Sequence, residues 1–373
     1  METMITPSEV VTNDLDYICS SLKEEFAAIS GKKLLITGGA GFLGYYLVQS
    51  VLHWNGMRDS DRHIRLTVCD NYIRGVPQWL AALEGRSTLT LFRYDVTKPL
   101  PENIGDFQYI IHAASIASPT YYRKYPIETM DANVNGLRTL LEHFLSGKQR
   151  GVNPEGFLFF SSSEIYGDPT PENIPTPETY RGFVSCTGPR ACYDEAKRYG
   201  ETLCVNFAAQ HRLPVRVARP FNNYGPGLKI TDGRVIPDFA RNVLNQKDLV
   251  MLSDGSPTRT FCYVADAIVG YYKILVKGRS GEAYNIGVEE PEIAVASLAE
   301  RIVAISRELF GYSGRVVRKQ SADTKYLVDN PNRRSPIINK ARNELGFNPS
   351  INLDQGLERS LIWYSGNRHA EEA

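Results

Sequence analysis

The residues best suited to chemistry are a tyrosine and a lysine four positions apart. Tyr193 and Lys197 lie in 190–210, a segment with a helical pattern, so both side chains are predicted on one helical face. A phenol near an ammonium group has its ionised form favoured, and Tyr193 is therefore predicted to act as a base towards a substrate hydroxyl near neutral pH. The same spacing recurs at Tyr94 and Lys98, but there the chain runs off a strand towards a proline and loses the helical geometry.

A second group of polar side chains follows a predicted strand. The apolar run 157–162 leads into Ser162, Ser163 and Glu164, and ligands of doubly wound sheets bind at that end of the strands. Ser162 is predicted to share a proton network with Tyr193, although capping of the next turn is an alternative use of its hydroxyl. Glu164 is predicted to position the substrate or a proton-delivering water. These three residues join the tyrosine and the lysine in the predicted catalytic group.

The elements that must position these residues alternate between short apolar runs and longer mixed segments. The apolar runs are 33–37, 65–70, 89–95, 109–113 and 157–162. Such alternation indicates a parallel sheet with crossover helices. We therefore expect an α/β fold, a Rossmann-like doubly wound parallel sheet with a smaller α/β C-terminal lobe that binds substrate.

The length of 373 residues exceeds the size at which a single hydrophobic core usually stops growing, so two lobes are expected. The dinucleotide-binding domain is predicted over 31–218, with a return segment at about 258–287. The substrate lobe is predicted over 219–257 and 288–373. Residues 1–30 are an N-terminal extension with one weakly amphipathic stretch, which predicts an added helix outside the main domain.

A glycine-rich turn follows the first predicted strand and precedes an apolar helix. Gly38 permits the tight turn, Gly41 lets the backbone approach a pyrophosphate, and Gly44 lets the helix pack closely on the strand. The helix N-terminus then faces the phosphates. The predicted cofactor contacts in this turn are Gly38, Gly41, Phe42, Leu43 and Gly44.

The next strand ends at Asp70, which is followed by Asn71. A carboxylate at this place can accept hydrogen bonds from an adenosine ribose diol and would repel a 2′-phosphate. NAD is therefore the expected cofactor rather than NADP. The alternative is that Asp70 caps a turn together with Asn71.

The spacing of three between successive glycines resembles that of the short-chain dehydrogenase/reductase superfamily, and two further strand ends resemble its extended branch. These are Asp95-Val96 and the run that contains Ala113, Ala114 and Ser115. The resemblance implies that Asp95 and Val96 bind adenine and that Ala113 and Ala114 lie along the cofactor. Ser115 is expected to contact the substrate.

The stretch 161–263 is similar to UDP-glucuronate decarboxylases, most specifically in 188–195. In those enzymes a serine stands before the strand-end glutamate, as Ser163 does here, whereas sugar-nucleotide 4,6-dehydratases have an aspartate acid there. Simple 4-epimerases usually lack the adjacent glutamate, which this chain has as Glu164. The resemblance implies NAD-dependent oxidation of the sugar at C4 and decarboxylation of UDP-glucuronate to UDP-xylose or the 4-keto pentose.

Departures from that pattern leave alternatives open. The chain has Ser162 where threonine is common and Ile337 where an aspartate is usual. A 4,6-dehydratase, a 4-epimerase or a 4-dehydrogenase of another nucleotide sugar are alternatives within the class. A non-catalytic dinucleotide-binding regulator is an alternative of another class. Such a protein would need none of Tyr193, Lys197 and Glu164, so their presence argues against it.

Groups that can bind anions gather in the loop-rich part of the chain after residue 219. Planar guanidinium groups match phosphate oxygens bidentately, as a sugar diphosphate requires. Arg259 is expected to neutralise either a substrate carboxylate or the diphosphate. The predicted substrate contacts here are Asn222, Arg234, Arg259 and Arg334.

The charge balance predicts a small-molecule ligand. Lys and Arg number 42, as do Asp and Glu, so neither nucleic acid nor a membrane is an expected partner. Six scattered cysteines without a C-x-x-C spacing favour a reducing cytoplasm and no metal site. The family resemblance implies a homodimer with a four-helix interface, formed by 126–145 and 190–210.

Overall fold

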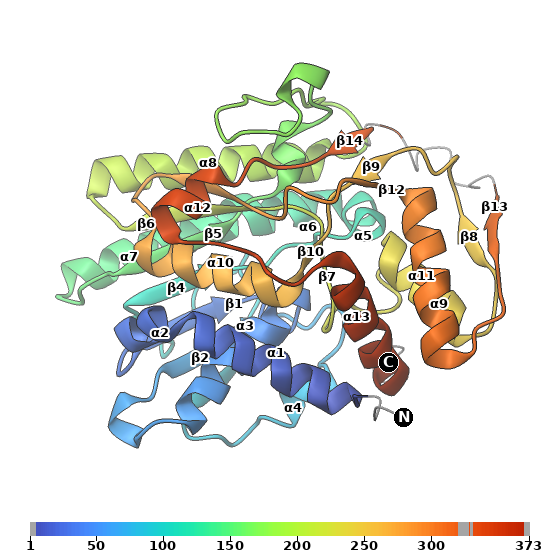
Figure 1. Cartoon of the computed structure of the whole chain (residues 1–373). Coiled ribbons are helices and arrows are strands. Elements are labelled where there is room, and N and C mark those ends of the chain that lie inside the picture. The colour runs from blue at the N-terminus through green and yellow to red at the C-terminus, as the bar shows by residue number, and fades with distance from the viewer. Residues whose placement is uncertain (1–4, 320–327, 329–330, 369–373) are drawn as a thin grey trace.

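The computed structural model describes residues 5–319, 328 and 331–368. Its centre is a seven-stranded sheet in the order β11-β6-β5-β4-β1-β2-β3 (Figure 1), and all neighbouring strands are parallel. The strands are β1 Lys33–Thr37, β2 Arg65–Asp70, β3 Leu89–Arg93, β4 Tyr109–His112, β5 Gly156–Phe160, β6 Val215–Pro220 and β11 Ala283–Ile286. This doubly wound order confirms the predicted fold class.

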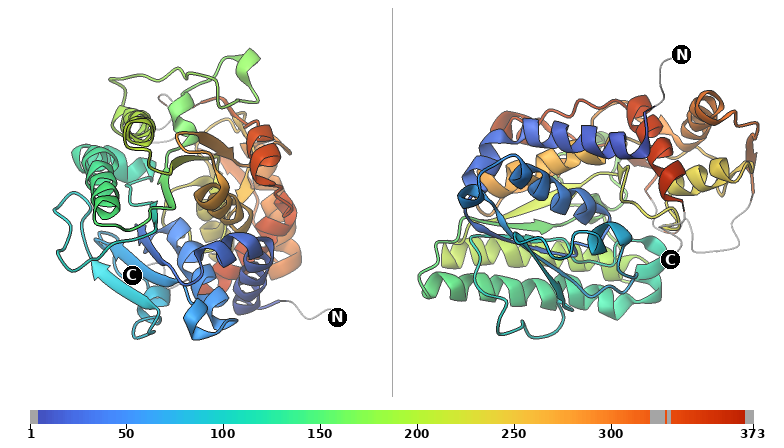
Figure 2. Two further views of the ribbon diagram at one scale, coloured as in Figure 1. Left: turned by 90° about the vertical axis from the view of Figure 1, so that its left-hand side faces the viewer. Right: turned by 90° about the horizontal axis from the view of Figure 1, so that it is seen from below.

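Helices cover both faces of the sheet (Figure 2). Helices α3, Phe42–Gly56, and α10, Val264–Lys277, pack on one face. Helices α7, Leu137–Gln149, and α8, Ala191–His211, pack on the other. Because both faces are covered, β4 and β5 are buried at every residue and form continuous apolar runs. Each of the five predicted strand runs begins within one residue of an observed strand.

The remaining elements lie around the carboxyl edge of the sheet or on its flanks. The short or peripheral helices are α4 Gln78–Ala81, α5 Pro119–Lys124, α6 Pro126–Asp131, α9 Val235–Leu244, α11 Val295–Phe310, α12 Asn339–Leu345 and α13 Leu353–Asn367. The short strands are β7 Asn223–Tyr224, β8 Leu249–Met251, β9 Thr258–Arg259, β10 Cys262–Tyr263, β12 Ile293–Ala294, β13 Val316–Arg318 and β14 Arg333–Arg334. Helices α9 and α11 and the parallel pair β8 and β13 form the side lobe of Figure 1.

The N-terminal extension is part of the main core. Helices α1, Pro7–Ser21, and α2, Lys23–Ile29, contact α3, α10 and α13. The fully buried carboxylate of Asp14 accepts hydrogen bonds from the hydroxyls of Tyr46 and Tyr263, each at 2.6 Å, and from Arg359 Nη1 at 2.7 Å. The prediction of a helix outside the main domain was therefore wrong. The apolar positions divide between two helices that meet at Leu22, so no single helical period reveals the buried face.

Candidate active site

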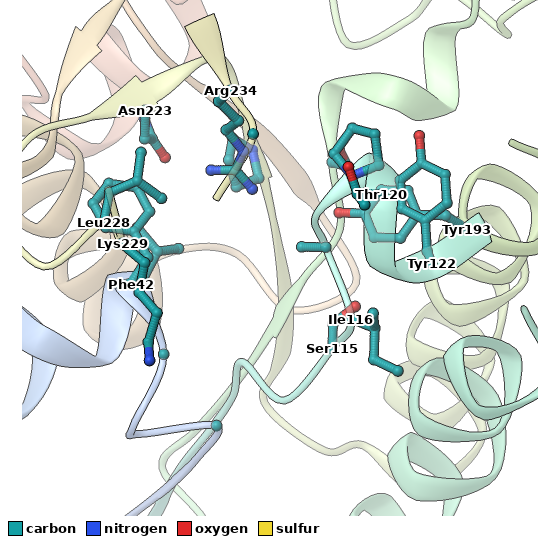
Figure 3. Close-up of a pocket in the computed structure, with 18 of the residues that line it drawn as sticks. Phe42, Ser115, Ile116, Thr120, Tyr122, Tyr193, Asn223, Leu228, Lys229 and Arg234 are labelled. Atoms are coloured by element: carbon teal, nitrogen blue, oxygen red, sulfur yellow. The ribbon is translucent and has the colours of Figure 1, made fainter. Parts of the chain in front are cut away.

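A cavity of about 910 Å³ lies at the carboxyl edge of the sheet, near the upper end of the usual range for small-molecule pockets. Phe42, Leu228 and Lys229 lie on one side of it (Figure 3). Ser115 and Tyr193 lie on the other side. Every residue of the predicted cofactor and substrate contacts lines this cavity.

The glycine turn at one end of the cavity leaves no room for side chains at two of its positions. Gly38 has a φ of +74°, and a Cβ there would lie 2.5 Å from the backbone nitrogen of Ala114. A Cβ at Gly44 would lie 2.2 Å from the carbonyl oxygen of Gly39. Gly41 is the N-cap of α3, whose first turn contains Phe42. This geometry fits the pyrophosphate of a dinucleotide at a helix N-terminus.

Asp70 joins the glycine turn to the loop that follows β2. Its Oδ2 accepts a hydrogen bond from the amide of Ala40 at 3.0 Å, and its Oδ1 accepts one from Tyr72 at 2.8 Å. Burial raises the pKa of Asp70, against the lowering effect of these amides. Each carboxylate oxygen has two lone pairs, so capping of the turn and a contact with a ribose diol are compatible.

The third strand leads to the other predicted cofactor contacts. Asp95 Oδ1 accepts hydrogen bonds from the amide and the hydroxyl of Thr97, at 3.0 and 2.9 Å. The Tyr94 hydroxyl donates to the carbonyl oxygen of Lys98 at 2.7 Å. Tyr94 and Lys98 therefore lie in a local turn and do not share a helical face, which agrees with the expectation from the sequence.

Tyr193 lies in the first turn of α8, with its ring 5.2 Å from that of Tyr122 and nearly parallel to it. A hydrogen bond joins Tyr193 to Ser162. The Ser162 hydroxyl also accepts from the amide of Glu164 at 3.2 Å, so it caps the turn at Ser163–Tyr166 as well. The turn-capping alternative is therefore confirmed, and a shared proton network of Ser162 with Tyr193 stays a prediction.

Lys197 is buried and bonded to the main chain. Its Nζ donates to the carbonyl oxygen of Phe160 at 2.6 Å and lies 5.6 Å from the centre of the Tyr193 ring. Burial lowers the pKa of Lys197 to about 7. Burial raises the pKa of Tyr193 to about 12, while the hydrogen bond from Ser162 acts in the opposite direction. Burial is the largest cause of both shifts, and the lowering of the phenol's pKa by Lys197 stays a prediction.

Glu164 lies between two arginines. Arg334 donates to both of its oxygens, at 2.7 and 2.5 Å, and Arg190 forms an ion pair with Oε2. Burial acts to raise the pKa of Glu164, but the charges of Arg190 and Arg334 lower it to about 2. Glu164 is therefore a carboxylate at neutral pH. Because its oxygens already bind guanidinium groups, Glu164 is unsuited to act as a proton donor.

Arg259 packs directly beside this group. Its Nη1 donates to the carbonyl oxygens of Thr258 and Asn332, at 2.7 and 3.1 Å, and its Nη2 donates to that of Pro331 at 2.5 Å. Burial and the charge of Arg334 lower the pKa of Arg259 to about 9. These bonds tie β9 to the segment that carries Arg334, its partner in the β9–β14 register. Contact of Arg259 with a substrate carboxylate stays a prediction.

Two further predicted contacts are held by neighbouring groups, one by a main-chain carbonyl and one by a side-chain carboxylate. Asn222 has a φ of +43°, and its Nδ2 donates to the carbonyl oxygen of Thr260 at 2.8 Å. Arg234 immediately precedes α9, and its Nε lies 3.1 Å from Asp232 Oδ1. Both residues line the cavity.

Sequence reasoning missed Arg190, Asp194 and Tyr122. Arg190 precedes α8 and lies 3.6 Å from Asp194. Burial and the charge of Glu164 raise the pKa of Asp194 to about 8. The i, i+4 spacing of Arg190 and Asp194 around the predicted base was a signal that could have identified this pair.

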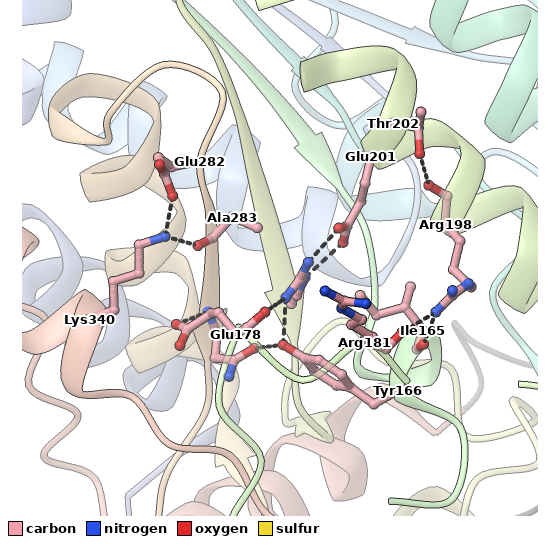
Figure 4. A network of polar contacts seen from close by, with 12 residues as sticks. Ile165, Tyr166, Glu178, Arg181, Arg198, Glu201, Thr202, Glu282, Ala283 and Lys340 are labelled. Atoms are coloured by element: carbon pink, nitrogen blue, oxygen red, sulfur yellow. Dashed lines mark hydrogen bonds and ion pairs between the residues drawn. The ribbon is translucent and has the colours of Figure 1, made fainter. Parts of the chain in front are cut away.

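A polar network behind the cavity fixes the segment between Glu164 and α8 (Figure 4). Arg219 binds both oxygens of Glu201, at 2.8 and 2.6 Å, and donates to the Tyr166 hydroxyl at 2.7 Å. Asn285 donates to the carbonyl oxygens of Thr176 and Ile337. The network therefore connects the central sheet with the two segments that supply Arg190 and Arg334.

Within the described ranges, no group of three or more His, Cys, Asp or Glu side chains is arranged to hold a metal ion. No helix in the described part of the chain has the length and apolar character needed to cross a membrane.

Comparisons with known proteins agree with this geometry. Residues 34–287 match the family described as NAD dependent epimerase/dehydratase. The chain is 36% identical over 325 residues to UDP-glucuronic acid decarboxylase 3 of Arabidopsis thaliana, covering 87% of this chain and 86% of the relative. It is 35% identical to UDP-glucuronic acid decarboxylase 1 of Xenopus tropicalis, covering 89% and 72%. A solved epimerase structure from Methanothermobacter thermautotrophicus is similar, with a TM-score of 0.78, 26% identity and coverage of 95% and 98%.

Proposed function

The chain belongs to the NAD dependent epimerase/dehydratase family, and from this premise we propose that it decarboxylates UDP-glucuronate to UDP-xylose or the 4-keto pentose. The observation that carries the proposal is the group of three buried arginines that lines the cavity beside Glu164. Three guanidiniums, those of Arg190, Arg259 and Arg334, gather around the carboxylate of Glu164. A substrate with a carboxylate and a diphosphate supplies the anions that such a site needs.

The residues at the glycine turn fit the cofactor of the family. Gly38 and Gly44 allow the close backbone contacts that shape the turn. Gly41, at the N-cap of α3, lets a pyrophosphate approach the backbone, and Asp70 is available to a ribose diol. Ala113 and Ala114 line the cavity between this turn and Tyr193. NAD held there would supply the hydride acceptor for oxidation at C4 of the sugar and the hydride donor for the later reduction.

The chain's own residues move the protons. Tyr193 removes the proton of the C4 hydroxyl, and the hydrogen bond from Ser162 stabilises the phenolate. The carboxylate on C5 is then β to the C4 ketone, so the bond between C5 and the carboxyl carbon breaks and carbon dioxide leaves. The electron pair delocalises into an enolate, whose oxygen is held by the hydroxyls of Tyr193 and Ser162. Protonation at C5 and reduction at C4 complete the pentose.

Dehydration and epimerisation fit the site less well. Loss of a hydroxyl requires an acid at the position of Ser163, and a serine hydroxyl is a poor acid. Ser163 is also buried in the turn Ser163–Tyr166. A 4-epimerase has no need for three arginines around one carboxylate.

The test is to incubate the protein with UDP-glucuronate and catalytic NAD in deuterium oxide and to follow the sugar by NMR. We expect UDP-xylose or its 4-keto precursor, with deuterium at C5, because the enolate takes its proton from exchangeable groups. An intact carboxylate with inverted C4 would identify an epimerase. No reaction with UDP-glucuronate, while a neutral hexose nucleotide gains a C6 methyl, would identify a dehydratase.

We also propose a homodimer, supported by exposed apolar side chains on two neighbouring helices. Ile127 and Met130 on α6 are 65% and 44% exposed, and Tyr199 and Val205 on α8 are 50% and 45% exposed. Light scattering at micromolar concentration should give twice the chain mass of 41.8 kDa. Tyr199→Asp should shift the protein towards monomers, since it places a charge in the apolar contact. A wild-type monomer would contradict the dimer.

A cytoplasmic location belongs to the same proposal. It is supported by six cysteines that are all free, four of them buried, because thiols persist in a reducing compartment.

A further inference from the structure

Segments far apart in the sequence meet along one side of the cavity. We call 71–77, the loop after β2, the cofactor loop, and 225–235 the substrate segment. Gly227 has a φ of +87°, and a Cβ there would lie 2.4 Å from the Cβ of Tyr45 on α3. The substrate segment therefore crosses directly over the helix that begins at the glycine turn.

Asp232 connects these two regions. It is 3% exposed, and its Oδ2 lies 3.0 Å from Arg74 Nη1 in the cofactor loop. Its Oδ1 lies 3.1 Å from Arg234 Nε. The Ser118 hydroxyl donates to the carbonyl oxygen of Asp232 at 2.9 Å and fixes the backbone at this residue. One buried carboxylate is thus shared by two arginines that line the same cavity.

Arg74 has two further contacts that hold it in this position. Lys229 Nζ, from the substrate segment, donates to the carbonyl oxygen of Arg74 at 2.9 Å. The Arg74 guanidinium lies 4.9 Å from the centre of the Tyr121 ring, a distance suited to a cation–π contact. The cofactor loop and the substrate segment are therefore joined by a side-chain ion pair and by a separate hydrogen bond.

We call the contacts of Asp232 with Arg74 and Arg234 the bridge. An anion bound in the cavity changes the electrostatic balance among these three charges. Arg74 and Arg234 repel each other, and Asp232 neutralises only one of the two charges. A diphosphate bound at Arg234 supplies the missing negative charge. The repulsion on Arg74 then falls, so its ion pair with Asp232 becomes stronger.

We propose that Asp232 is a positioning residue that couples the two ligand sites. It directs Arg234 towards the diphosphate and, through Arg74, holds the substrate segment on the cofactor loop. Bound nucleotide diphosphate then slows the loss of the dinucleotide, which keeps the cofactor in place between the oxidation and the reduction of one turnover. This inference rests on the proposed cofactor and sugar-nucleotide sites.

The test measures the release of NADH from the loaded protein, followed by stopped-flow fluorescence after mixing with excess NAD, with and without saturating UDP. In the wild-type protein UDP should slow the release of NADH about tenfold. A change of this size is expected from strengthening one partly buried charge pair. Because coupling between affinities is reciprocal, NADH should tighten UDP binding by the same factor by which UDP tightens NADH binding, with both affinities measured by calorimetry.

Variants of Arg74 distinguish the effect of losing its ion pair with Asp232 from the effect of a general loss of stability. Arg74→Met keeps the length of the side chain over Tyr121 but removes the charge, so release should become about tenfold faster without UDP, and UDP should no longer slow it. Arg74→Lys should restore part of the UDP effect. The matched control is Arg315→Met, which breaks an exposed ion pair with Asp248 away from the cavity and should leave both rates unchanged.

Two outcomes would overturn the coupling. UDP could fail to slow release in a wild-type protein that binds both ligands, or it could slow release equally in wild type and Arg74→Met. A wild-type protein that binds neither NADH nor UDP would instead contradict the proposed function, and the coupling with it.

Discussion

Tyr193→Phe is expected to lower kcat by about 10³-fold, since it deletes only the hydroxyl that exchanges a proton with the C4 oxygen. The ring would keep its place against Tyr122, so the fold and the affinity for NAD should be nearly unchanged. Loss of the hydrogen bond to Ser162 should change the free energy of unfolding by only about 1 kcal/mol. The measurement is single-turnover formation of NADH with UDP-glucuronate.

The matched control is Tyr199→Phe on the same helix, half exposed and away from the cavity. It should oxidise the sugar at a rate within about twofold of wild type, because phenylalanine keeps the apolar ring in the proposed dimer contact and the position lies outside the cavity. A Tyr193→Phe protein within tenfold of the wild-type rate would show that another group is the base.

Glu164→Gln is expected to reduce turnover by about 10²-fold and the free energy of unfolding by about 2–4 kcal/mol. The substitution leaves the guanidiniums of Arg190 and Arg334 buried beside a neutral amide. Without its counter-ion Arg334 loses its fixed orientation, so carbon dioxide release should fall more than NAD binding does. Calorimetry for NAD and carbon dioxide release from UDP-glucuronate separate the two effects.

The pH dependence of stability gives a second measurement on the same variant. The folded-state pKa of Glu164 lies at about 2, below its ordinary value of 4.5. Its contribution to stability is therefore present above pH 4.5 and is lost as the pH falls towards 2. This part of the acid sensitivity should be absent from Glu164→Gln.

Glu25→Gln is the control for Glu164→Gln. Glu25 is buried between Lys273 and Lys277, at 3.4 and 2.8 Å, and lies outside the cavity. It should lose stability without a selective loss of decarboxylation. If both variants slow carbon dioxide release in proportion to their loss of stability, Glu164 has only a structural role.

The parts of the molecule that local sequence specifies could be predicted. The strands are short apolar runs buried on both faces, and the glycine turn needs only Gly38, Gly41 and Gly44 in sequence order. The Tyr193 and Lys197 pair depends on one helical turn. Each of these features is governed by neighbours within a few residues, so local sequence patterns were sufficient to predict it. The observed sheet then confirms the fold class.

The parts that depend on long-range pairing could not be predicted. Glu164 and Arg334 are 170 residues apart, and the register of β9 with β14 places Arg334 opposite Arg259. No local pattern indicates that register. Lys197 was expected to act on a phenol, but its bond to Phe160 depends on how closely α8 packs on β5. The sharing of Asp232 by Arg74 and Arg234 likewise requires two loops that only the folded chain brings into contact.

The position of Asp14 has a consequence for how the chain folds during its synthesis. Asp14 on helix α1 is made well before two of its partners, since Tyr263 follows 249 residues later and Arg359 follows 345 residues later. At ribosomal rates of about 5–20 residues per second, the wait for the last partner is roughly 20–70 s. During that time the apolar face of α1 stays exposed on the nascent chain, and the carboxylate of Asp14 lacks two of the three partners described above. Helix α1 therefore completes its docking only after Arg359 has been made, and chaperones that recognise apolar helices have a long interval in which to bind it.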